Sequence, residues 1–383
     1  MTHTAARAFI LGVRPLSHLV HPREVVRQFT PNWFAASMGT GVLALALAQF
    51  PATVPGLRAV GEGLWLFNIG LFSLFSLLYA ARWVFFFDGA KRIFGHSVVS
   101  MFFGCIPIGL ATIINGFLSF GLARWGHVAL EIALVLWRLD AGLAVVCGVA
   151  IPFMMFTRQS HSMDQMTAVW LLPVVAAEVA AVSGGLLGPH LGDVHQQLAV
   201  LIASYVLWAC SVPLAMSILV ILVLRLAVHK LPHASMAPSS WLALGPIGTG
   251  ALGLLVLGSA APSIFAANGL GDYGAAAKAI GLIGGLLLWG YGFWWAMMAA
   301  LITLRYLRAG LTFNIGWWGY TFPVGVYALA TLRLSTLLPI GAFAIIGGAL
   351  VLALAATWLV VGAQTLRGAW RGDLFVAPCL QQD

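Results

Sequence analysis

The feature that most limits how this chain can fold is a series of apolar segments, each long enough to cross a lipid bilayer as a helix. A helix needs about 20 apolar residues for this crossing. The segments are residues 31–50, 59–83, 97–121, 128–156, 166–187, 196–225, 240–261, 276–304, 314–335 and 338–366. Because 61% of the residues are hydrophobic and 8% are charged, a soluble fold is excluded. The sequence predicts an all-α integral membrane protein with a ten-helix transmembrane domain over residues 31–366.

The positions of Lys and Arg predict how this domain is oriented. With the N-terminus inside, 14 of the 19 basic residues fall on the inner side. Those on the outer side are Arg58, Arg124, Lys278 and Arg333. An excess of basic residues marks the cytoplasmic side. We therefore expect a cell (inner) membrane protein whose N-terminal segment (1–30) and C-terminal tail (367–383) are both cytoplasmic. The N-terminal segment is either a basic helix on the membrane surface or a tail.

Several classes of function are disfavoured by what the chain lacks. Its basic residues are scattered singly, which argues against a nucleic-acid partner. The four cysteines show no CxxC spacing, the ten histidines fall in termini, connections or helix ends, and no HExxH motif occurs. We therefore expect no metal site and no cofactor. An integral-membrane enzyme would need such a cluster at one membrane face, so transport is the favoured class.

The segment Phe313–Arg333, FNIGWWGYTFPVGVYALATLR, holds several aromatic residues beside Pro323. A proline within a helix leaves the carbonyl four residues earlier, here that of Gly319, without its partner. Lipid cannot satisfy this carbonyl, so the turn should face protein or a water-filled cavity. An aromatic ring at such a break is a candidate plug for a narrow conduit. The alternative is a ring that only packs between helices.

A weaker regularity relates the odd-numbered segments, which begin roughly 65–75 residues apart, as in a repeat. Each has an aromatic residue followed by Gly or Pro. These are Trp33 before Gly39 and Gly41, Phe103 before Pro107, Trp170 before Pro173, Trp241 before Pro246 and Gly248, and Trp318 before Pro323 and Gly325. The pattern favours a helical hairpin repeated five times. The alternative is chance, since Gly and Pro are common in transmembrane helices.

Six stretches in this order resemble the tellurite-resistance/dicarboxylate transporter family, which includes plant slow anion channels and fungal malate and sulfite transporters. They are HPREVVRQFTPNWFAASMGTG (21–41), FFGCIPIGLATIIN (102–115), WRLD (137–140), WLLPVV (170–175), KLPHASMAPSSWLALGPIGTGALGL (230–254) and WWGYTFPVGVYALAT (317–331). The resemblance implies five hairpins around a quasi-fivefold central pore, with the odd helices lining it. It also implies a homotrimer and a phenylalanine gate, here Phe322.

The predicted conduit carries weak hydrogen-bonding groups and helix breaks rather than fixed charges. Strong cationic sites would hold an anion too tightly to release it. The candidate pore-lining residues are Ser37, Gly39, Thr40, Gly41, Pro107, Thr112, Asn115, Pro173, Gly248, Thr249, Gly250, Thr321 and Pro323. The alternative for each Ser, Thr and Gly is helix–helix packing, where small residues belong.

Three ionisable residues are expected at bilayer depth: Arg138, Asp140 and Glu178. A buried charge is costly unless it is paired. Counted along their helices, the three lie at similar depth, so we predict that Arg138 pairs with Glu178 or Asp140 and holds two helices together.

Together these observations predict transport of a small anion, with a C4-dicarboxylate such as malate as the first choice of cargo. Sulfite efflux and a chloride or nitrate channel are the alternatives. Whether the protein is a channel or a coupled transporter stays open.

Overall fold

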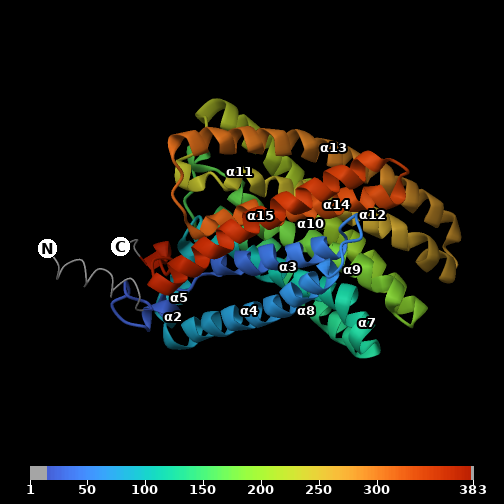
Figure 1. Cartoon of the computed structure of the whole chain (residues 1–383), viewed down its shortest axis with the longest axis horizontal. Coiled ribbons are helices and arrows are strands. Elements are labelled where there is room, and N and C mark those ends of the chain that lie inside the picture. Colours follow the sequence, from blue (N-terminus) through green and yellow to red (C-terminus); the bar gives the residue numbers. More distant parts are fainter. Residues whose placement is uncertain (1–14, 381–383) are drawn as a thin grey trace.

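The computed structural model describes residues 15–380, which fold as helices running along one common direction, with no strand in this range (Figure 1). Each predicted segment contains one main helix. These are α3 (Phe34–Ala48), α4 (Leu57–Phe85), α6 (Cys105–Gly116), α8 (His127–Thr157), α9 (Leu172–Leu187), α10 (Val194–His229), α12 (Leu244–Ala267), α13 (Gly271–Ala309), α14 (Phe322–Leu337) and α15 (Gly341–Arg371). The short helices are α2 (Glu24–Arg27), α5 (Phe87–Lys91), α7 (Leu122–Trp125) and α11 (Ser239–Leu242). Much of the predicted N-terminal segment, including Arg7 and Arg14, lies outside the described residues.

Eight helical stretches in this range are long and apolar enough to cross a membrane. The two remaining segments contain α3 and α14, whose α-helical parts have 15 and 16 residues. They are short because 3-10 turns replace α-helix at their beginnings. The all-α membrane fold is therefore confirmed, and the count of ten spans stays a prediction for these two helices.

The main helices form an inner and an outer layer. α3 packs against α6, α6 against α9, α9 against α12, α12 against α14, and α14 against α3, so these five helices close a ring. Each outer helix packs against the inner helix that precedes it, giving the pairs α3–α4, α6–α8, α9–α10, α12–α13 and α14–α15. Along 18 residues of the stretch that contains α9, 94% are buried, whereas along 18 residues of α8 only 17% are buried. The predicted hairpin arrangement is present.

All five inner helices begin with a change of backbone geometry. Short 3-10 turns precede four of them, at Pro31–Trp33, Val99–Gly104, Ala168–Leu171 and Ile315–Tyr320, and α11 precedes α12. Pro107, Pro173, Pro246 and Pro323 all fall in the first turn of their α-helix. The expected mid-helix break at Pro323 is therefore wrong. Proline starts these helices, since the first four N–H groups of a helix have no partner within it.

The recurring aromatic residues anchor the start of each inner helix to its surroundings. Trp318 Nε1 donates to Thr365 Oγ1 of α15 at 3.0 Å, and Trp241 Nε1 donates to Thr303 Oγ1 of α13 at 2.8 Å. The other three make ring contacts: Trp33 with Phe75, Phe103 with Tyr79, and Trp170 with His161. For these five rings, the packing role is the one that the structure supports.

Candidate functional site

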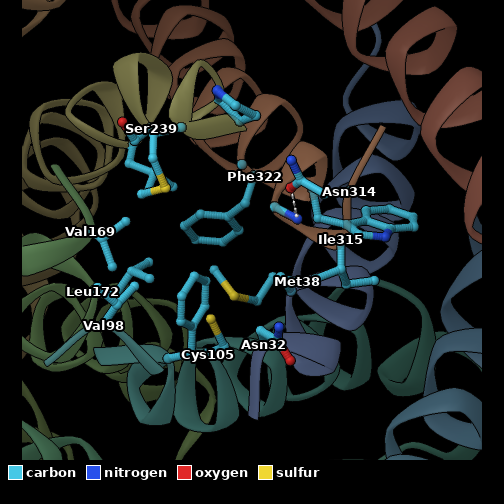
Figure 2. A pocket seen from close by; sticks show the side chains of 18 of the residues that line it. Asn32, Met38, Val98, Cys105, Val169, Leu172, Ser239, Asn314, Ile315 and Phe322 are labelled. Carbon is cyan, nitrogen blue, oxygen red and sulfur yellow. Dashed lines mark hydrogen bonds between the residues drawn. The ribbon is translucent and has the colours of Figure 1, made fainter. Parts of the chain in front are cut away.

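A cavity of about 430 Å³ lies where the five inner helices begin (Figure 2). Every inner helix contributes to its lining, for example through Met38, Cys105, Leu172, Pro246 and Phe322. Because their first turns meet at one cavity, the five helices run parallel and direct their N-terminal ends toward it. Helix N-termini carry partial positive charge, which favours anions.

Phe322 occupies the middle of this cavity. Figure 2 shows its ring directed inward, with Met38, Leu172 and Ser239 around it. The side chain is 4% exposed, and no ring contact involves it within the described part of the chain. It follows directly on the turn that Trp318 anchors to α15. The ring thus lies in the cavity without stacking on another ring of the described chain.

The lining has few polar groups and no Lys, Arg or His among the described residues. Asn314 is held in place, because its Nδ2 donates to the Ser235 carbonyl at 3.1 Å and its Oδ1 accepts from the Gly316 N–H at 2.9 Å. This amide joins the connection before α14 to the one before α12. An anion here would meet weak donors and apolar walls, which permit passage without tight binding.

The C-terminal tail crosses the mouth of the cavity, with Asp373, Leu374, Val376 and Pro378 in its lining. Phe375 stacks on Trp33 with ring centroids 4.9 Å apart. Three further contacts hold the tail in place. The Ala377 N–H donates to Gln28 Oε1 at 3.1 Å, and Arg82 contacts Cys379 Sγ. Asp373 pairs with His18. The sequence predicted only a cytoplasmic tail here. The apolar side chain of Phe375 was the sequence signal that could have predicted this docking.

The structure places only two of the predicted path residues, Phe322 and Pro323, in the cavity lining. Others lie in contacts between helices. A Cβ at Gly39 would meet Thr321, one at Gly41 would meet Thr112, one at Gly248 would meet Tyr327, and one at Gly250 would meet Val212. Thr40 donates to the Ala36 carbonyl and accepts from Trp358, and Thr321 donates to the Trp318 carbonyl. For these residues the packing alternative holds.

The remaining predicted path residues are also buried and absent from the cavity lining. Pro107 and Pro173 start their helices. Ser37 Oγ, Asn115 Oδ1 and Thr249 Oγ1 are buried without a hydrogen-bond partner. Asn115 lies two turns beyond the lining residue Ile108 on the same face of α6, and Thr249 lies one turn beyond Gly245 on α12. These two side chains continue the cavity face deeper into the ring.

The predicted ion pair of Arg138 is wrong. Arg138 is exposed on α8, whereas Asp140 and Glu178 are fully buried and their carboxylate oxygens have no hydrogen-bond partner. The depths estimated from sequence did not determine how each helix is rotated. On α8, the buried side includes Trp137 and Asp140, and Arg138 points the other way.

Residues that sequence reasoning missed include Met38, Cys105, Ile108, Val169, Leu172 and Val175. All are apolar residues close to where α3, α6 and α9 begin. The only sequence feature that could have identified them as cavity-lining residues is their position beside the helix breaks. Their apolar side chains are those of any membrane segment.

Comparisons with known proteins identify the family of this chain. Residues 28–366 match the family model described as SLAC1, voltage-dependent anion channel. A sulfite efflux pump of Arthroderma benhamiae is 36% identical over 91% of this chain and 93% of its own length. An uncharacterised transporter of Methanocaldococcus jannaschii is 30% identical over 92% and 96%, and a malic acid transport protein of Schizosaccharomyces pombe is 21% identical over 91% and 80%. The expected family resemblance is thereby confirmed, and the chain belongs to the SLAC1 family of voltage-dependent anion channels.

Proposed function

We propose that this protein moves small anions across a membrane along the axis of its five inner helices, and that Phe322 closes this path. The observation that carries the proposal is the position of the Phe322 ring in a cavity to which all five inner helices contribute. The converging helix N-termini supply the attraction for an anion. The apolar lining supplies the weak binding that release requires.

Sulfite, as the singly charged bisulfite, is the cargo that we propose first. The cost of taking an ion out of water rises steeply with its charge, and the described cavity lining holds no cation to offset it. A dianionic dicarboxylate would bring two charges into this lining. The sulfite pump at 36% identity supports the same choice. Malate, favoured from sequence alone, becomes the second candidate, which the malic acid transport protein at 21% identity supports.

Flux into proteoliposomes tests the cargo. Labelled sulfite should enter protein-containing vesicles faster than protein-free vesicles, and unlabelled malate, chloride and nitrate should compete weakly. The same vesicles loaded with labelled malate give the matched comparison. Faster transport of malate than of sulfite would overturn the choice of cargo, and no anion flux above protein-free vesicles would overturn the transport proposal itself.

We further propose that the protein works as a homotrimer. Arg138 lies on the outer face of α8, flanked by the exposed apolar residues Val135 and Leu139. A charge facing lipid at this depth is costly, and a second copy packed on this face would shield it. Native mass spectrometry in mild detergent should give the mass of three chains. A single-chain mass under every detergent condition would contradict this assembly.

The proposed location is the cell (inner) membrane, with the first and last described residues on the cytoplasmic side. The two ends of the described chain lie together, because the Leu16 N–H donates to the Trp370 carbonyl. The excess of Lys and Arg on that side supports the orientation. A reporter enzyme that is active only in the cytoplasm, fused to the C-terminus, tests this orientation and is expected to be active.

A further inference from the structure

The contacts of α14 leave only one of its faces directed toward the axis of the ring. Gly325 packs against Val42 of α3, and Leu332 packs against Gly347 of α15. Tyr327 lies against Gly248 of α12, and its hydroxyl donates to the Trp289 carbonyl of α13. Trp289 Nε1 also donates to Thr331 Oγ1. The remaining face is the one that starts with Phe322.

Arg333 lies on this axial face. It follows Phe322 by eleven residues, which is about three turns, and Val326 and Leu329 lie on the same face between them. At 1.5 Å per residue, Arg333 is about 16 Å from Phe322 along the helix. It lies four residues before the last residue of α14, Leu337, toward the end of the ring opposite the cavity.

Arg333 has no partner for its charge within residues 15–380. Its Nε is buried without a hydrogen-bond partner, and no salt bridge or side-chain hydrogen bond involves its guanidinium. The buried arginines Arg82 and Arg225 differ: Arg82 donates to the carbonyls of Phe29 and Gly89, and Arg225 donates to those of Lys230 and Asp164. At the same end of the molecule, Glu62 forms a salt bridge with Arg124. The guanidinium of Arg333 is therefore available to an exogenous anion.

An anion that travels along the axis needs a cation at this end. The inner helices are parallel, so their C-terminal ends gather here, and helix C-termini carry partial negative charge that repels anions. Arg333 can offset this charge at the end of the proposed path. On α3, Gln49 follows Met38 by the same eleven residues and is exposed at the helix end, so helical geometry places its amide at the same end of the ring.

We propose that Arg333 binds the transported oxyanion at the end of the path opposite the Phe322 cavity. The planar guanidinium fork matches two oxygens of one oxyanion, so it discriminates oxyanions from halides. This inference rests on the proposed anion transport and names the group that attracts the anion on that side.

The test compares Arg333→Gln and Arg333→Lys with a matched control, Lys278→Gln. Lys278 is an exposed cation near the start of α13, at the same end of the molecule but on the outer layer. Sulfite flux is measured against sulfite concentration. Loss of one charged hydrogen-bonding group predicts a half-saturating concentration about tenfold higher in Arg333→Gln. The lysine variant should lie between it and the parent, and Lys278→Gln should match the parent.

A second variant separates charge from structure. In Arg333→Cys, a cationic methanethiosulfonate reagent should restore flux and an anionic one should lower it further, with the treated parent controlling for Cys105, Cys147, Cys210 and Cys379. An unchanged half-saturating concentration in Arg333→Gln, or equal effects of the two reagents, would overturn the proposal. A parent without flux above protein-free vesicles would instead overturn the proposed function.

Discussion

Replacing Phe322 by alanine is expected to raise anion flux several-fold. The ring fills the middle of the cavity and rests on apolar side chains such as Met38 and Leu172. Its removal leaves a methyl group in a space lined by five helices, so the proposed path widens at this position. The measurement is anion current in planar bilayers, normalised to the amount of folded protein, because loss of a buried Phe costs about 3–5 kcal/mol of stability.

Two variants distinguish an opened path from a loosened fold. Phe322→Leu keeps part of the volume and should raise the current less than the alanine variant. Phe117→Ala removes a buried ring that packs on Trp65, outside the cavity lining. It should lose stability without gaining current. If Phe322→Ala carries no more current than the parent, Phe322 is not the steric block, and alternating access becomes the better mechanism.

The largest effect on folding is expected from Gly104→Val. A Cβ at Gly104 would lie 2.0 Å from the Leu172 carbonyl oxygen and 3.0 Å from the Pro173 Cα. Both are backbone atoms at the start of α9, so they cannot rotate away as a side chain would. The 3-10 turn before α6 and the start of α9 must therefore separate, which costs about 3 kcal/mol or more. Thermal unfolding in detergent should show a large fall in Tm or no folded protein.

Gly63 of α4 provides the matched control, since a Cβ there meets nothing within 4 Å. Gly63→Val should stay close to the parent apart from the small cost of a β-branched residue in a helix. Gly104→Ala should already be destabilised, because the clash begins at Cβ. A Gly104→Val protein with the parent's Tm would show that α6 and α9 do not meet this closely.

For the recurring aromatic residues, the sequence predicted their positions but not their roles. Aromatic residues near helix breaks were predicted from spacing, and all five such positions lie at or near the start of an inner helix. The role of these rings was not predictable, because a plug and an anchor look alike in sequence. Trp318 donates a hydrogen bond to Thr365 of α15, whereas Phe322, four residues later, points into the cavity.

The sequence by itself determined the class of fold, the segments and their hairpin order. These depend on properties that a segment carries alone, above all an apolar run of bilayer length. The family followed from motifs in order along the chain.

Only the tertiary structure decided which side of each helix faces the axis. The inner helices are apolar on nearly every side, so their sequence has no periodicity to reveal rotation. That is why Thr40 and Gly250 were assigned to the path although they contact other helices, and why Arg138 was paired although it points outward. The docking of Phe375 on Trp33 joins residues far apart in the chain. No local preference of either segment specifies this contact. It forms only when the tertiary structure brings the two segments together.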